Sequence, residues 1–118
     1  MQAKTTTLVV MKTRLKYHDI FCMRLKQARL AKGLSQKRLG IAAGIDEFVA
    51  SARINRYEKG VHEVNIETAQ LLADVLNVPL AYFYTVDEEL AELMLLFISL
   101  TKDAKIDVLD FAKKKARV

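Results

Sequence analysis

The stretch from Leu34 to Gly60 contains two short helical patterns separated by Gly44. This arrangement constrains the fold more than any other feature of the sequence. Ser35 can cap the first helix, because its side chain can accept a hydrogen bond from a free N–H group of the first turn. Gly44 can end that helix, and Gly60 can end the second. One of these helices can therefore be held by a core while its outer face stays free.

The rest of the chain is interpreted as further helices joined by short loops. Apolar residues recur at three- and four-residue spacing, and Asn65 and Asp87 are placed to cap two of these helices. The predicted helices span about residues 19–32, 36–43, 47–59, 66–76, 80–84, 87–100 and 103–115. One proline and four glycines disfavour a many-turned β fold. The sequence predicts an all-α fold.

The pattern divides the chain into three parts. Residues 1–17 are threonine-rich and basic, and we expect a flexible N-terminal arm there, with a short strand over residues 5–11 as the alternative. Such an arm could contact phosphates or the minor groove of DNA. Residues 18–86 hold the five central helices, and residues 87–118 hold the C-terminal helices.

Charge is distributed unevenly along the chain. Residues 1–62 carry 13 Lys and Arg against 4 Asp and Glu, whereas residues 63–101 carry no Lys or Arg and 7 acids. This asymmetry indicates a surface that faces a polyanion, unless the charges are segregated by chance on a solvated surface. The single cysteine, Cys22, excludes an intramolecular disulfide. The apolar run at residues 8–11 is too short for a signal segment or a membrane span, so we expect a cytoplasmic protein without a membrane partner.

Four segments together resemble the lambda repressor/Cro-like (XRE-type) helix-turn-helix family. They are LKQARLAKGLSQ (25–36), LGIAAGI (39–45), INRYEKG (54–60) and IETAQLLADVLNVPLAYFY (66–84). The resemblance implies a five-helix lambda-repressor-like domain, followed here by one or two extra C-terminal helices. It also implies that the second helix lies across the DNA backbone and that the third enters the major groove of double-stranded DNA.

The resemblance and the residue chemistry together assign DNA contacts. The residues expected to contact bases are Ser51, Ala52, Arg53, Asn55 and Arg56. The residues expected to contact phosphates are Ser35, Gln36, Lys37, Arg38 and Lys59. Arginine suits guanine and asparagine suits adenine, whereas alanine or a serine β-carbon can meet a thymine methyl. Arg53 could equally bind a phosphate, Gln36 could reach an edge base, and Lys37 and Arg38 could serve only solubility.

Two further features concern the helix over residues 47–59. By resemblance, Glu58 pairs with Arg29 of the first helix in a structural ion pair. The family usually has about six residues from the turn glycine to the isoleucine of the third helix, whereas Gly44 and Ile54 are ten apart. The simplest interpretation is a helix that starts one turn earlier, capped by Asp46, with Phe48 or Val49 packed inward. The alternative is that the extra residues loop out.

The helix over residues 87–100 is apolar at every position from Leu93 to Ile98, so it lacks a polar face there. The last helix could cover part of this surface, and a homodimer interface is expected to cover the remainder. The alternative is a purely intramolecular cap. The residues expected at the interface are Leu93, Leu96, Phe97, Leu100 and Phe111.

The sequence therefore predicts a DNA-binding transcriptional regulator, a repressor that reads a pseudo-palindromic operator as a homodimer. The alternative is a protein-interaction or antitoxin-like module of the same fold that acts mainly through its C-terminal helices. No catalytic constellation, phosphate-binding loop or cofactor motif is present in the sequence, so we expect no enzyme activity and no cofactor. His18 and His62 lack partners at ligand spacing, so we expect no metal site.

Overall fold

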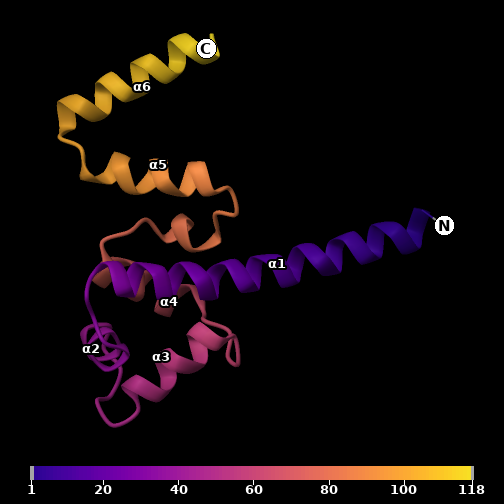
Figure 1. Cartoon of the computed structure of the whole chain (residues 1–118), viewed down its shortest axis with the longest axis vertical. Helices are drawn as coiled ribbons and strands as arrows, with labels where there is room; N and C mark the ends of the chain where they lie inside the picture. The colour runs from indigo at the N-terminus through magenta and orange to yellow at the C-terminus, as the bar shows by residue number, and fades with distance from the viewer. Residues whose placement is uncertain (1, 118) are drawn as a thin grey trace.

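The computed structural model describes the backbone of residues 2–117 and the side chains of residues 17–117. Over that backbone the chain forms helices and no strand, which confirms the all-α fold. The elements are α1 (Gln2–Ala31), α2 (Gln36–Ala42), α3 (Ala50–Lys59), α4 (Ile66–Leu76), the 3-10 helix η1 (Leu80–Tyr84), α5 (Glu88–Ser99) and α6 (Lys102–Ala116). In Figure 1, α2 and α3 lie on one side of α1, and α5 and α6 lie on the other.

Four helices begin at side-chain caps. The side-chain oxygens of Ser35, Asn65, Asp87 and Thr101 each accept a hydrogen bond of 2.8–3.2 Å from the backbone N–H three residues further on. Each bond satisfies an N–H group that has no partner within its helix. The helix over 103–115 was expected to begin at Asp103, but Thr101 caps it two residues earlier.

The first helix begins much earlier than expected. Its backbone is helical from Gln2, so the prediction that this helix starts near Asp19 is wrong, and so is the alternative of a short strand over residues 5–11. The physical reason is that residues 2–32 contain no glycine or proline. A run of threonines lowers helix propensity by only a few tenths of a kcal/mol per residue, roughly, and does not end a helix. That residues 1–17 act as a flexible arm stays a prediction.

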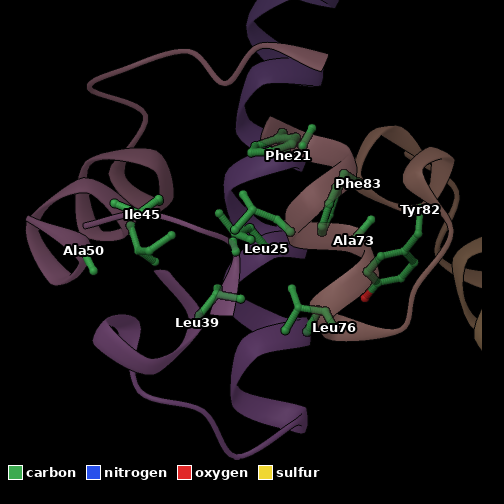
Figure 2. Packing of buried hydrophobic residues seen from close by; sticks show 14 of the residues in the cluster. Phe21, Leu25, Leu39, Ile45, Ala50, Ala73, Leu76, Tyr82 and Phe83 are labelled. Carbon is green, nitrogen blue, oxygen red and sulfur yellow. The ribbon is translucent and has the colours of Figure 1, made fainter. Parts of the chain in front are cut away.

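The core lies where α1, α2, α3, α4 and η1 meet, and Figure 2 shows its packing. Leu25 of α1, Leu39 of α2 and Ile54 of α3 are 0% exposed, and so is Phe83 of η1. Phe21 packs against the Phe83 ring at a centroid distance of 5.1 Å, which joins α1 to η1. The burial of Ile54 fixes which side of α3 faces the core.

A charged residue is buried within this structure. Arg24 of α1 is 2% exposed, and its guanidinium donates to the carbonyl oxygen of Thr85 from Nε at 3.1 Å and from Nη2 at 2.9 Å. Nη1 and Nη2 also donate to the Glu88 carboxylate at 3.3 and 3.2 Å. The Arg24 guanidinium lies 5.5 Å from the centre of the Tyr82 ring. Arg24 therefore fixes the segment between η1 and α5 to α1, a role that the helical spacing did not predict.

The C-terminal helices pack little. Ala91 is the one buried residue within α5, and α6 has none between Lys102 and Ala116. Leu93, Leu96 and Phe111 are 50%, 55% and 64% exposed. The covering of α5 by α6 is thus at most partial, and these expected interface residues lie on the surface.

Candidate nucleic-acid interface

The crossing of α2 and α3 depends on two small residues. A Cβ atom at Gly40 would lie 2.8 Å from the Cβ of Ala50, closer than side chains pack. Both residues are buried, and the Gly40 carbonyl accepts a hydrogen bond of 2.9 Å from the Ile45 N–H. Because glycine has no side chain, α2 and α3 can pack closely at this crossing.

The four extra residues before α3 loop out. Residues 47–49 form a turn, and α3 begins at Ala50 rather than near Glu47. The Asp46 carboxylate accepts a 2.9 Å bond from the Phe48 N–H, so it stabilises the turn instead of capping the helix. Phe48 is 89% exposed and Val49 is 45% exposed, so the expectation that one of them packs inward is wrong.

The physical reason lies in the pattern of the buried face. Ala50 and Ile54 are both 0% exposed and lie one turn apart. An additional N-terminal turn would place Asp46 or Glu47 on the same buried face. Burying a carboxylate without a partner is costly. The alternative interpretation, in which the extra residues leave the helix, is the one that the structure has.

The expected base-contacting residues follow this turn on α3. Ser51, Ala52, Arg53 and Arg56 are exposed, and Asn55 is half-buried. Ile54, in their midst, points into the core. The exposed residues therefore lie on the side of α3 that faces away from the protein interior. Arg53 and Arg56 place two guanidinium groups there.

A hydrogen-bonded network holds this helix from behind. Arg29 donates to the Glu58 carboxylate from Nε at 2.6 Å and from Nη2 at 3.0 Å, and its Nη1 donates to the Leu34 carbonyl at 3.0 Å. The side chains of Arg29 and Glu58 are 10% and 4% exposed, so the structure brings the expected ion pair together in a largely buried position. Gln36 Nε2 donates to Glu58 Oε1 and to Asn55 Oδ1, both at 3.2 Å.

The Gln36–Asn55 bond was not predicted. No spacing rule connects the first turn of α2 with the middle of α3, so only the three-dimensional crossing reveals it. The bond fixes the Asn55 amide and leaves its NH₂ group as a donor for a partner outside the protein. It also commits the Gln36 NH₂ group to the protein rather than to a phosphate.

The expected phosphate-contacting residues lie at the ends of the two helices. Lys37 and Arg38 are exposed in the first turn of α2, and Lys59 is exposed at the end of α3. The Ser35 hydroxyl accepts the Arg38 N–H at 3.0 Å, which leaves its own O–H free to donate. Free N–H groups and the helix dipole favour an anion near this first turn.

The C-terminal end of α3 is joined to α1. His18 Nε2 lies 3.0 Å from the Gly60 carbonyl oxygen, which accepts a hydrogen bond from the protonated ring nitrogen. His18 and His62 line a cavity of about 590 Å³ together with Tyr84, whose pKa is raised by burial. Among the side chains of residues 17–117, no group of three His, Cys, Asp or Glu residues is placed to hold a metal ion.

In the part of the chain that the structure describes, every helix is too short or too polar to cross a membrane.

Residues 25–83, half of the chain, match the helix-turn-helix family model. The chain belongs to the XRE/Cro-like helix-turn-helix family, as the four sequence segments indicated. This is a family of non-enzymatic, DNA-binding transcriptional regulators, in agreement with the expectation that the chain is not an enzyme.

The similar proteins are regulators by name. The chain is 48% identical to the transcriptional regulator BswR, whose crystal structure it matches with a TM-score of 0.76 over 79% of this chain and 92% of that chain. It is 34% identical over 61 residues to uncharacterized HTH-type transcriptional regulators of Sinorhizobium medicae (strain WSM419) and Rhizobium meliloti (strain 1021). These matches cover 52% of this chain and 41% of each relative, so the chain matches less than half the length of those two proteins.

Proposed function

We propose that this protein is a sequence-specific transcriptional repressor that reads double-stranded DNA as a homodimer, with α3 in the major groove. The observation that carries the proposal is the exposed side of α3, where Arg53 and Arg56 lie beside Ser51 and Ala52. Arginine can donate two hydrogen bonds to guanine O6 and N7. The buried Arg29–Glu58 pair supports the helix from the other side.

Asn55 fits this role in a restricted way. Because Gln36 occupies its carbonyl oxygen, its NH₂ group is left to donate, and N7 of a purine is an acceptor in the major groove. Ala52 and the Ser51 β-carbon suit thymine methyl groups. Arg53 lies on the same exposed side and can serve either a base or a phosphate.

Phosphate contacts are assigned to the flanking positions. Lys37 and Arg38 at the start of α2 and Lys59 at the end of α3 are exposed cations, and the Ser35 hydroxyl adds a donor. Gln36 stays among the proposed phosphate contacts only if its bonds to Asn55 and Glu58 rearrange. Such contacts supply affinity and register but little sequence information.

Dimerisation is assigned to α5 and α6. Their exposed apolar residues would be buried against a second copy, and two reading helices would then meet half-sites about one helical turn of DNA apart. The proposed interface residues are Leu93, Leu96, Phe97, Leu100 and Phe111. Such an operator would be pseudo-palindromic because the dimer is two-fold symmetric.

Selection of bound sequences from a random duplex pool tests the proposal. We expect a two-fold symmetric consensus for the full chain and a relaxed preference at one position per half-site for Arg56→Ala. Lys37→Ala should weaken binding to all sequences alike and reduce the slope of log K against log salt by about 1. Lys102→Ala on α6 removes the same charge and serves as the control. An unchanged consensus for Arg56→Ala would contradict the groove assignment.

A second candidate function is supported by the same C-terminal surface. The apolar side chains of α5 and α6 could bind a different protein, in the manner of an antitoxin-like subunit. A stoichiometric partner that displaces the homodimer would favour this function. Specific DNA binding with a steep salt dependence would favour the first.

A further inference from the structure

The turn between α2 and α3 carries an aromatic side chain that the protein itself does not use. Phe48 is 89% exposed, the highest value among the large apolar residues of the described chain. Its backbone is fixed by two bonds to Asp46, one from the Phe48 N–H to Oδ1 at 2.9 Å and one from the Val49 N–H to the carbonyl oxygen at 3.1 Å. The ring is therefore presented from an ordered turn.

The position of the turn connects it with the reading helix. Phe48 lies two residues before Ala50, where α3 begins, and the exposed Ser51 and Ala52 follow at once. In Figure 1 the chain between α2 and α3 forms the end of the molecule farthest from α5 and α6. A helix that enters the groove with its N-terminal residues brings this turn to the DNA as well.

The charges around the turn indicate which part of the DNA it meets. From Leu39 to Ala52 the chain has no Lys or Arg, and it has two acids, Asp46 and Glu47. The side chains of this segment therefore offer a phosphate no cation, and the two acids repel it. Its apolar tip suits a methyl group inside the groove, and thymine provides one in the major groove.

We propose that Phe48 is a specificity-determining residue, which contacts the C5-methyl group of a thymine at the edge of each half-site. This inference rests on the proposed DNA-binding function. It assigns base recognition to Phe48, in the segment by which this chain exceeds the usual spacing of its family.

Replacing thymine by uracil removes only the methyl group and so tests the contact directly. We would select the consensus of the full chain, then measure binding to operators with deoxyuridine at each thymine in turn, for the wild type and for Phe48→Ala. At one position per half-site, replacing thymine by uracil should lower the affinity of the wild type about fourfold, because one buried methyl group is lost. The same replacement should leave the affinity of Phe48→Ala unchanged. Leu71→Ala, which truncates a half-exposed apolar residue on α4, should behave as the wild type.

Four outcomes are informative. A uracil penalty that is lost in Phe48→Ala supports the contact. Equal uracil penalties in the wild type and Phe48→Ala at every position would overturn it, and so would loss of a heterologous protein partner in Phe48→Ala without a change in DNA preference. If the wild type selects no consensus, the proposed function itself fails. Because Phe48 makes little contact with the fold, unchanged thermal unfolding of Phe48→Ala is expected and can be checked.

Discussion

The two ends of the molecule differ in how completely their side chains are partnered. Around α2 and α3, the polar residues are joined to one another, as in the bonds of Arg29 and Gln36 to Glu58, and the small residues Gly40 and Ala50 meet at the crossing. Around α5 and α6, Leu93 and Leu96 remain half exposed, and α6 has no buried residue between Lys102 and Ala116. The first end has a connected polar network beneath its exposed arginines, whereas the second exposes apolar side chains along both helices.

This difference fits the two kinds of recognition proposed above. A helix that reads bases would need a fixed orientation, and the hydrogen-bonded network of Arg29, Gln36 and Glu58 holds α3 within the protein. An oligomer interface needs apolar surface that remains free until a second copy covers it. The comparison can be tested by removing partners at the first end and apolar contacts at the second.

The largest effect is expected at the Arg29–Glu58 pair. Arg29→Ala would leave the Glu58 carboxylate, 4% exposed, with Gln36 as its remaining partner. We expect a loss of about 3–5 kcal/mol in the free energy of unfolding, because a largely buried charge would be left without its counterion. Urea unfolding followed by circular dichroism measures it.

The matched control removes both charges. Arg29→Met with Glu58→Leu leaves no uncompensated carboxylate, so it should recover most of the lost stability. A loss of under about 1 kcal/mol for Arg29→Ala alone, the size typical of exposed pairs, would show that the network does not hold α3 in place.

At the other end, Leu96→Asp should act on association rather than on folding. Leu96 is 55% exposed in the protomer, so the change should barely alter unfolding of a monomer. In a dimer it would remove an apolar contact and bury a charge, which we expect to weaken association by about 3 kcal/mol, roughly a hundredfold. Light scattering across a dilution series measures this change.

Glu92→Gln is the corresponding control, since it changes a charge on an exposed side chain of the same helix without adding one to the apolar surface. If Leu96→Asp has the same mass as the wild type at every concentration, the C-terminal surface is not the homodimer interface. The second candidate function would then be favoured.

Much of the fold could be predicted because its signals are local. Asn65 and Asp87 cap helices where expected, and α4 has the predicted bounds, since capping requires only residues within one turn. Burial of Ile54 also followed from helical spacing. The early start of α1 was missed because threonines weaken a helix without ending it.

The site could be predicted only in part. The identity and exposure of Arg53 and Arg56 follow from helical position, so residue patterns suffice for them. The Gln36–Asn55 bond and the buried Arg24 depend on how helices cross, which no local pattern contains. The loop that exposes Phe48 could be predicted only as an alternative. An aspartate such as Asp46 can either cap a helix or stabilise a turn, so its identity does not decide between the two.

A smaller effect is expected at the α2–α3 crossing. Gly40→Ala would place a Cβ 2.8 Å from that of Ala50. Overpacking costs about 1–3 kcal/mol, and the better helix propensity of alanine offsets up to about 1 kcal/mol. We therefore expect a net loss of about 1 kcal/mol and a displaced α3, seen as a lower unfolding midpoint and weaker specific DNA binding.

Adding Ala50→Gly to Gly40→Ala moves the methyl group to the other side of the contact. The double variant should regain the stability of the wild type, because volume and propensity are both conserved. Strict additivity of the two single changes would show that the two residues do not meet at the crossing.

The smallest effect concerns the acids of the turn. Glu47→Gln and Asp46→Asn each remove one negative charge near the expected DNA surface, and asparagine keeps a side-chain acceptor for the Phe48 N–H. A unit charge about 8 Å from a phosphate in water contributes about 0.5 kcal/mol, so each variant should bind all sequences about twofold more tightly. Fluorescence anisotropy at low salt measures this gain, which should vanish as salt rises. If Glu47→Gln instead loses preference at a cytosine while Asp46→Asn does not, Glu47 accepts from the cytosine amino group, and the turn reads bases through a carboxylate.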